Sequence, residues 1–320
     1  MTLIPVEAPP EGAVDLGELI DAVRALHVDL TLGDAEQPVP AVVETGPSTV
    51  LLPMVATSRR LSLTVVKVLT DAQADGPLQQ STVLLLDAAT GTRLAVLAGG
   101  PGTRMRTAAA SAVATDALAR ADSSVLGLVG AGPLAVEHVA AIRRVRPIDH
   151  VVVWSRTARR IEEFRRALRA RERADGSPPV GVTVSADVRG VVSAVDVLCT
   201  LSPAREPHVH GAWFGPGLHV NAVGAPPRPD HREIDGAALA RARVVVDSRE
   251  VQLRKSGEVL LALDEAAVTL EDVGLELGEV LTGAHGRRRP DEITLFESVG
   301  LALQDLAYAA LATGRPVVAR

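Results

Sequence analysis

The pattern of hydrophobic and polar positions changes period twice within the first 120 residues. Leucine, isoleucine and valine recur every three or four positions over residues 12–32, which predicts an amphipathic helix. Residues 38–100 form short β-rich runs separated by Gly, Pro and Asp. They predict a mostly antiparallel sheet with hairpins, and DAATGTR at 87–93 is the clearest turn. Residues 103–120 are an alanine-rich helix that can pack closely against a neighbour.

From residue 124 onward, short apolar strands alternate with helices. Fully apolar strands in this alternation predict a doubly wound parallel sheet. The last third of the chain is expected to be helical over residues 250–263, 273–283 and 294–314. The strand segments are SVLGLV, HVVVW, GVTVS, DVLCTL, HVNAVG and RVVVD.

The predicted fold class is α/β, with a Rossmann-type doubly wound parallel sheet and a second, discontinuous α+β domain. The last helix has a long apolar face and no strand after it, so we expect it to pack on the N-terminal sheet. The alternative is that it caps the parallel sheet. The predicted domains are residues 1–115 with 300–320, whose apolar sheet also suits a dimer interface, and residues 116–299.

Composition and charge narrow the class of protein. The 320 residues are 47% hydrophobic and 22% charged, which suits a folded chain of two domains and excludes a disordered one. Aromatic residues make up 2%, so little is available for stacking on nucleic-acid bases. The formal net charge of −6 also argues against a phosphate-backbone partner. We therefore expect no nucleic-acid partner.

The single cysteine, Cys199, excludes an intramolecular disulfide and a cysteine-based zinc site, and it suits a reducing compartment. We expect it to be a small buried core residue. His208 and His210 are interpreted as loop histidines, because no third ligand is spaced to help them bind a metal. The sequence shows no signal peptide and no transmembrane run, which predicts a cytoplasmic protein without a membrane partner.

The turn after the first parallel strand carries the pattern G-x-G-x-x-A. Its first glycine makes the tight turn, its second lets the backbone approach a pyrophosphate, and its small third residue lets helix and strand pack closely. The pattern follows an apolar strand and opens a helix, which is the context of a dinucleotide site. The expected cofactor-binding residues are Gly130, Ala131, Gly132, Pro133 and Leu134.

The end of the second parallel strand indicates NADPH in preference to NADH. NAD sites usually place an acidic residue there to bind the ribose 2′-hydroxyl, whereas this chain has Ser155, Arg156 and Thr157. A carboxylate would repel a 2′-phosphate, and these three side chains can hydrogen-bond it. Arg159 or Arg160 could contribute from the following helix. The alternative is that Arg156 is a solvated surface charge.

Five motifs in order resemble the ornithine cyclodeaminase/μ-crystallin family: VKVLT, RMRTAAAS, GLVGAG, HVNAVGA and FESVGLALQDLA. The resemblance covers about residues 15 to 315. That family includes cyclodeaminases, ketimine reductases, certain alanine dehydrogenases and opine-type dehydrogenases of amino-acid metabolism. Its members are typically homodimers that transfer hydride at a carbon bearing nitrogen with a nicotinamide cofactor. The resemblance therefore implies an oxidoreductase whose discontinuous domain binds substrate and forms the dimer.

The same resemblance implies roles for individual residues. Lys67 matches the family's active-site lysine, which can polarise an imine or transfer a proton; the alternative is a surface lysine. Arg106 matches the arginine that binds the substrate carboxylate, for which a guanidinium is suited; the alternative is a surface ion pair. Cofactor contacts are implied for Thr82, Thr107, Thr200, Leu201, Asn221, Val223, Gly224, Ser298 and Gly300.

Two departures from the family pattern concern the substrate. Cyclodeaminases carry an Asp where this chain has Ala225, so the second ammonium of a diamino acid would find no anion there. Residues 40–42, Pro-Ala-Val, lack the arginine of the family's P-x-R stretch, and the sequence leaves open whether Arg59 or Arg60 replaces it.

The sequence thus predicts an NADPH-dependent oxidoreductase that reduces a C=N bond in a ketimine or imine of a small amino or keto acid. One alternative is an amino-acid cyclodeaminase that uses NAD catalytically. The other is a protein that binds NADPH and a small ligand without turnover. The substrate is not indicated beyond the carboxylate expected at Arg106.

Overall fold

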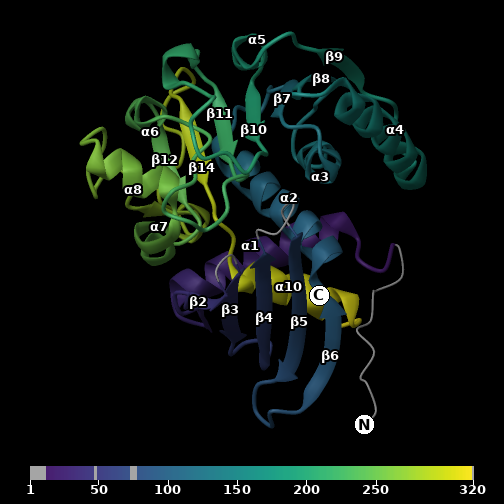
Figure 1. Ribbon diagram of the computed structural model, residues 1–320. Helices are drawn as coiled ribbons and strands as arrows, with labels where there is room; N and C mark the ends of the chain where they lie inside the picture. The colour runs from purple at the N-terminus through teal and green to yellow at the C-terminus, as the bar shows by residue number, and fades with distance from the viewer. Residues whose placement is uncertain (1–11, 47–48, 73–77, 319–320) are drawn as a thin grey trace. The chain divides into compact units, whose positions relative to one another are not determined.

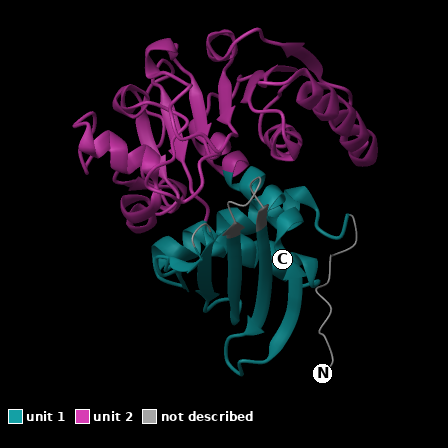
Figure 2. Ribbon diagram, in the orientation of Figure 1, with its two compact units in different colours: residues 1–110, 301–320 teal, residues 111–300 magenta. Residues whose placement is uncertain are grey.

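The computed structural model describes residues 12–46, 49–72 and 78–318. The chain divides into two compact units, residues 1–110 with 301–320 (unit 1) and residues 111–300 (unit 2), as Figure 2 shows. The sequence places the boundaries at 115/116 and 299/300, and the compact units divide at 110/111 and 300/301. Within the described ranges, no helix combines the length and apolar character that crossing a membrane requires.

Unit 1 contains an antiparallel sheet in the order β1-β3-β4-β5-β6, with β2 paired to β3. The β5–β6 hairpin closes at the predicted turn, where Asp87 Oδ1 accepts hydrogen bonds from the backbone amides of Ala89 and Thr90. The antiparallel sheet predicted over 38–100 is therefore confirmed. The strands are β1 (Ala35–Glu36), β2 (Val43–Gly46), β3 (Thr49–Ser58), β4 (Leu63–Ala72), β5 (Leu78–Asp87) and β6 (Arg93–Ala98).

Two helices cover one face of this sheet. Helix α1 (Leu16–Leu32) begins at Asp15, whose side chain accepts from the Glu18 amide, and ends at Gly33 with a φ of 82°. Helix α10 (Ala302–Ala312) packs on α1 and on β3, β4 and β5 (Figure 1). The apolar face of each helix and alternate residues of the strands form the buried layer between them.

Helix α2 (Gly99–Leu118) begins in unit 1 and ends in unit 2. Unit 2 is built on a parallel sheet in the order β13-β12-β14-β11-β10-β7-β8-β9. The chain runs from β7 through β8 to β9 on one side and then returns to β10 on the other side of β7, so β7 and β10 flank the switch point of a doubly wound sheet. The predicted α/β fold class is confirmed.

The elements of unit 2 follow one another as the alternation predicts. The strands are β7 (Val125–Val129), β8 (His150–Trp154), β9 (Gly181–Val184), β10 (Val197–Thr200), β11 (His219–Ala222), β12 (Arg243–Val246), β13 (Leu275–Glu276) and β14 (Thr294–Glu297). The helices are α3 (Pro133–Ile142), α4 (Ala158–Asp175), α5 (Val188–Val192), α6 (Gly236–Arg241), α7 (Arg249–Lys255), α8 (Gly257–Asp264), α9 (Leu277–Leu281) and the 3₁₀ turn η1 (Gly211–Trp213).

The structure of the last third of the chain differs from the sequence prediction in three places. Residues 250–263 form two helices, because the Ser256 hydroxyl accepts the Val259 amide and starts α8. Residues 273–283 include the short edge strand β13 before α9. Residues 294–297 are strand β14 between β11 and β12, and helix begins only at Ala302. A run as short as Thr-Leu-Phe-Glu does not distinguish a buried strand from a helix, so only the two neighbouring strands decide it.

Candidate active site and dinucleotide site

Unit 1 contains a buried cluster of charged side chains between its sheet and α10. Lys67 lies in the middle of β4 and is 1% exposed, on the sheet face that the helices cover. Its Nζ donates to Asp305 Oδ1 on α10 at 2.9 Å and to Thr103 Oγ1 on α2 at 2.8 Å. The alternative of a surface lysine is therefore wrong.

The surroundings of Lys67 make its proton easier to release. Burial lowers its pKa to about 8, since an ammonium loses hydration in the interior. The negative charge of Asp305 and its hydrogen bond to the ammonium raise this pKa, whereas the positive charge of Arg106 lowers it. Lys67 is thus protonated at neutral pH and has a pKa suited to proton transfer near it.

Arg106 lies on α2 and is 6% exposed, so the surface alternative is wrong for this residue too. Its Nη1 donates to Gln304 Oε1 at 2.7 Å, and its Nε lies 3.5 Å from Asp305 Oδ1. Gln304 Nε2 in turn lies 3.4 Å from His27 Nε2. Burial lowers the pKa of His27 to about 4, so its imidazole is neutral at pH 7.

The cluster has a net positive charge, because Lys67 and Arg106 face the single carboxylate of Asp305. Arg106 Nε and Asp305 Oδ2 are buried and have no hydrogen-bond partner among the described residues. A buried charge that is not balanced costs free energy. The cluster is therefore suited to a ligand with one carboxylate, which would balance the charge and accept from the guanidinium.

The motifs in the sequence did not indicate four of the partners in this cluster, which are Thr103, Gln304, Asp305 and His27. A signal was present, because a lysine between apolar strand residues needs an anion, and Asp305 stands alone among apolar residues of the last helix. The pattern could not show that these two residues, 238 positions apart, would meet.

Arg59 and Arg60, the two arginines that could replace the missing P-x-R arginine, each have partners inside the protein. Both lie at the β3–β4 turn, where Arg59 pairs with Glu36. Arg60 Nη2 lies 2.7 Å from Asp29 Oδ2, and its Nη1 donates to Val317 O at 2.6 Å. These contacts attach the turn to α1 and to the end of the chain, and both guanidinium groups are used there.

In unit 2, the turn after β7 has the shape that a pyrophosphate requires. Gly130 has a φ of 119°, and a side chain on it would lie 2.9 Å from Leu201 O. Gly132 is the N-cap of α3, no side chain caps the helix, and a Cβ on Gly132 would meet nothing within 4 Å. Ala135 is fully buried against the sheet. The helix start has no side-chain cap and leaves space for a phosphate to approach the backbone closely, which fits a dinucleotide. Pro133 suits the first helical position.

The loops after β10 and β11 lie at the same edge of the sheet as this turn. The Leu201 amide donates to Val129 O at 2.9 Å, next to the glycine turn. The Thr200 hydroxyl and the Gly224 amide both donate to Glu233, at 2.6 and 2.9 Å. Carboxyl ends of strands beside the switch point are where doubly wound sheets bind their ligands.

Three further candidates of unit 2 have partners inside the protein. Asn221 is fully buried, and its amide donates to Thr115 Oγ1 on α2 at 3.0 Å. The Ser298 hydroxyl and the Gly300 amide donate to the buried Asp247 Oδ2 at 2.6 and 3.0 Å. The Asn221 and Ser298 side chains and the Gly300 backbone amide are therefore used inside unit 2.

The end of β8 presents Ser155, partly exposed, followed by exposed Arg156 and Thr157. Thr157 is the N-cap of α4 and makes no capping hydrogen bond. Arg159 and Arg160 pair with the same glutamate of α4, whereas no carboxylate of the described chain pairs with Arg156. The group can accept a phosphate, because it combines a free guanidinium with an uncapped helix start.

Thr82 and Thr107 belong to unit 1, whereas the glycine turn belongs to unit 2. Thr82 is next to Val83, which pairs with Lys67 on the covered face of the sheet. Thr82 therefore lies on the opposite, exposed face. The Thr107 hydroxyl donates to Thr103 O within α2 at 2.7 Å.

The remaining polar candidates of unit 2 have ordinary structural roles. His208 Nε2 lies 3.2 Å from Ser202 Oγ, and His210 Nδ1 lies 2.9 Å from Asp235 Oδ2. Cys199 is buried, which raises the pKa of its thiol to about 12 and confirms that it is a core residue. Among the residues that the structure describes, no three ligand-type side chains come together as a metal site would require.

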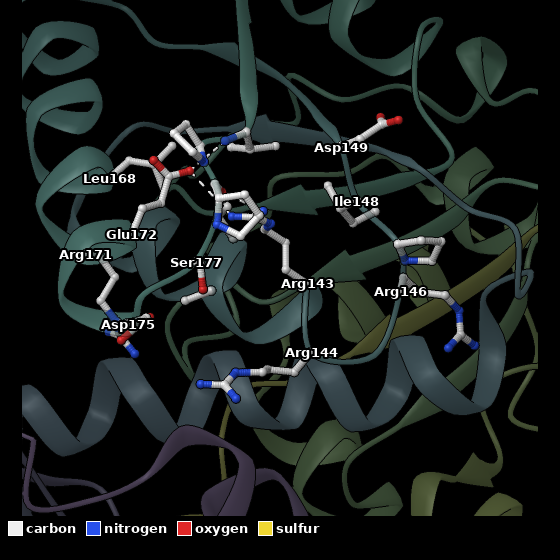
Figure 3. Close-up of a pocket in the computed structure, with 16 residues that line it drawn as sticks. Arg143, Arg144, Arg146, Ile148, Asp149, Leu168, Arg171, Glu172, Asp175 and Ser177 are labelled. Atoms are coloured by element: carbon white, nitrogen blue, oxygen red, sulfur yellow. Dashed lines mark hydrogen bonds and ion pairs between the residues drawn. The ribbon is translucent and has the colours of Figure 1, made fainter.

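A pocket of about 510 Å³ lies at the other edge of the parallel sheet. Figure 3 draws the residues that line it. The pocket is lined by the ends of α3 and α4 and by the residues before β8 and β9. Arg143 Nη1 lies 3.4 Å from Glu172 Oε1, and Arg171 Nε lies 2.7 Å from Asp175 Oδ2. Because these charges pair with one another at the amino ends of the strands, this pocket is not the expected dinucleotide site.

The doubly wound sheet with its glycine turn defines the class of dinucleotide-binding dehydrogenases. The model of the ornithine cyclodeaminase/mu-crystallin family matches residues 10–315. The chain belongs to this family, as the five motifs predict. Ketimine reductase mu-crystallin of Mus musculus is 38% identical over 235 residues, which are 73% of this chain and 69% of that protein.

Two solved structures are similar over almost the whole chain. The Thermococcus litoralis Δ1-pyrroline-2-carboxylate reductase, in complex with NADH and L-proline, has a TM-score of 0.88 and 31% identity, covering 95% of this chain and 94% of that one. An archaeal alanine dehydrogenase dimer with bound NAD has a TM-score of 0.86 and 30% identity, covering 95% and 92%. Both of these structures contain a nicotinamide dinucleotide.

Proposed function

We propose that this protein is an NADPH-dependent oxidoreductase that reduces the C=N bond of an imine carrying a carboxylate. The observation that carries the proposal is the buried pair of Lys67 and Arg106 with a shared carboxylate, Asp305. Relatives named as a ketimine reductase and as a Δ1-pyrroline-2-carboxylate reductase support the reaction class.

Each residue of the cluster has one task in this reaction. Arg106 would hold the substrate carboxylate, which balances the net positive charge of the cluster. Lys67 would donate a proton to the imine nitrogen, because its ammonium has a pKa of about 8. Asp305 keeps the ammonium in place through its 2.9 Å hydrogen bond. A nicotinamide cofactor, when bound, supplies the hydride for the imine carbon.

We propose that NADPH is preferred to NADH. The two similar structures contain NADH and NAD, so the preference is argued from this chain's own residues. The end of β8 carries no carboxylate that would bind a 2′-hydroxyl, and it presents Arg156 at the uncapped start of α4. A 2′-phosphate would find a cation, two hydroxyls and the positive end of a helix there.

Asp230 and Glu297 are two carboxylates that could be considered as replacements for the acid that a cyclodeaminase uses at the position of Ala225. Asp230 is exposed and pairs with Arg205 at 3.2 Å and with His231 at 2.8 Å. Glu297 is buried and accepts from the Ser256 hydroxyl. Neither carboxylate is available to a second substrate ammonium, which supports the reductase over the cyclodeaminase.

We also propose a homodimer formed through the uncovered face of the antiparallel sheet. Val55 and Val68 are each 36% exposed on this face, and Val66 and Leu84, next to them in register, are partly exposed. A contiguous apolar face on a sheet indicates an interface. The similar alanine dehydrogenase is a dimer, which agrees with this assignment.

A substrate screen tests the proposed function. Purified protein with NADPH is offered cyclic imines bearing a carboxylate, such as Δ1-pyrroline-2-carboxylate, and oxidation is followed by the loss of NADPH absorbance. We expect net oxidation without ammonia release. Ammonia from ornithine or lysine without net change in the cofactor would identify a cyclodeaminase instead. Tight NADPH binding with neither reaction would identify a binding protein.

A further inference from the structure

One buried carboxylate connects the loops that follow β10 and β11. Glu233 is fully buried and accepts four hydrogen bonds. Its Oε1 accepts from the Ser202 amide at 2.6 Å and from the Ser202 hydroxyl at 2.7 Å. Its Oε2 accepts from the Thr200 hydroxyl at 2.6 Å and from the Gly224 amide at 2.9 Å. Two loops from different strands are thus held by one side chain.

The loop after β10 is also in contact with the glycine turn. Leu201 stands between the two residues that Glu233 holds, and its amide donates to Val129 O at 2.9 Å. A Cβ on Gly130 would lie 2.9 Å from Leu201 O and 3.2 Å from Leu201 Cβ, so the turn fits closely against Leu201. Any movement of this loop therefore changes the surface on which the glycine turn rests.

Glu233 is itself held from the side away from these loops. Glu258 Oε1 accepts from the Glu233 amide at 2.7 Å, and its Oε2 accepts from the Ile234 amide at 3.3 Å. Burial raises the pKa of Glu233 to about 7, and its hydrogen bonds with Thr200 and Ser202 oppose that rise. An apolar residue would fill the same volume without this desolvation cost, so the carboxylate is explained by the donors that it gathers.

We infer that Glu233 is a positioning residue for the dinucleotide. It fixes the loops at 200–202 and 223–224 against the glycine turn and does not touch the cofactor itself. Outer partners that orient binding groups commonly change affinity when they are removed. The inference rests on the proposed function, because it takes this edge of the sheet as the dinucleotide site.

Glu233→Gln tests the inference. Glutamine keeps the volume but replaces one acceptor oxygen by an NH₂ group, so the Ser202 amide or the Gly224 amide must face a donor. We expect the Kd values of NADPH and NADH, measured by titration of the purified protein, to rise together by about ten-fold. Both should rise because the loops that Glu233 holds follow β10 and β11, whereas the 2′-phosphate is expected at the end of β8.

Glu172→Gln is the matched control. Glu172 is also a buried carboxylate, 4% exposed, and accepts the Val180 amide at 2.8 Å, but it lies at the other edge of the sheet. We expect both variants to lower the unfolding midpoint and only Glu233→Gln to weaken cofactor binding. A purely structural role would lower both midpoints and leave both cofactor affinities unchanged, which would overturn the inference.

Thr200→Val is a milder variant that keeps the test open if Glu233→Gln does not fold. It preserves the side-chain shape and removes one of the four donors, so we expect a Kd about three-fold higher. If both variants are soluble and both bind the cofactors with the affinity of the unmutated protein, the inference is overturned. If only Thr200→Val is soluble, an unchanged cofactor affinity of this variant overturns it. If the unmutated protein binds neither NADPH nor NADH, the proposed function itself fails.

Discussion

At the scale of single residues, the most unusual feature of the protein is a buried, charged lysine. Lys67 is among the largest fully buried side chains, and it is stabilised there by Asp305 and Thr103. Removing an ammonium from water costs several kcal/mol, on the order of what one ion pair with additional hydrogen bonds can offset. The same burial lowers the pKa of Lys67. Desolvation of the ammonium therefore both costs free energy and favours the proposed proton transfer.

Lys67→Met should abolish most turnover and leave NADPH binding nearly unchanged. Methionine keeps much of the length of the side chain and carries no proton, and a positioned acid contributes about 10²- to 10⁴-fold to rate. Steady-state kinetics with the imine substrate and a separate NADPH titration measure the two effects. A variant that retained most of its activity would show that Lys67 is a structural residue.

Asp305→Asn should move the pH dependence of the reaction. With Lys67 as the acid, kcat falls as pH rises through about 8, because the ammonium loses its proton there. Asp305 raises the pKa of Lys67, so its removal should shift this loss of activity to lower pH. It also leaves two buried cations without an anion, which should lower the free energy of unfolding by about 3–5 kcal/mol. An unchanged alkaline limit would contradict the role given to Lys67.

At the scale of elements, the proposed dinucleotide site lies where strands end and helices begin. The glycine turn joins β7 to α3, the Ser-Arg-Thr stretch joins β8 to α4, and the loops held by Glu233 follow β10 and β11. Parallel strands bring these junctions to one edge, where helix starts present backbone amides to a bound anion. Sequence patterns predicted these junctions well, because each lies within one local segment.

Arg156→Ala should narrow the difference in affinity between NADPH and NADH. A charge-assisted contact with the 2′-phosphate is worth about 1.5–3 kcal/mol, and NADH has no such phosphate. Titration of both cofactors gives the two Kd values. Arg165→Ala is the control, since Arg165 is exposed farther along α4, pairs with Glu162 at 3.6 Å, and should affect neither cofactor. Equal affinities for NADPH and NADH in the unmutated protein would refute the preference.

At the scale of the whole molecule, the chain folds as two units of different construction. In unit 1, α10 packs on β3, β4 and β5 of the antiparallel sheet, and α1 packs on α10 and β1. The parallel sheet of unit 2 has the apolar strands typical of a doubly wound fold. An uncovered face with partly exposed valines is the feature of unit 1 that a second copy of the chain would bury.

Val68→Glu should produce monomers if this face forms the homodimer. A carboxylate in the middle of an apolar interface would be desolvated without a partner, which opposes association. Light scattering after size-exclusion chromatography gives the mass. Val184→Glu is the control and should leave the mass unchanged, because Val184 is also an exposed valine but lies on the edge strand of the other sheet. A dimeric Val68→Glu protein would place the interface elsewhere.

The sequence by itself determined the features that depend on short segments of the chain. These are the alternation that gives the two sheets, the first helix, the glycine turn and the family motifs. Hydrophobic period and turn chemistry act over a few residues, so they can be recognised without the fold. Strand β14 could not be recognised in this way, because its four residues are compatible with helix until β11 and β12 pair with them.

Only the tertiary structure decided which polar residues act together. It brought Asp305 into hydrogen-bonding distance of Lys67 and Gln304 into hydrogen-bonding distance of Arg106. It also brought Glu233 into hydrogen bonds with the loops after β10 and β11. It also paired Arg60 with Asp29, which lies on α1. A buried charge must be balanced by whatever group the fold brings within about 4 Å, and that group can be hundreds of positions away in the chain.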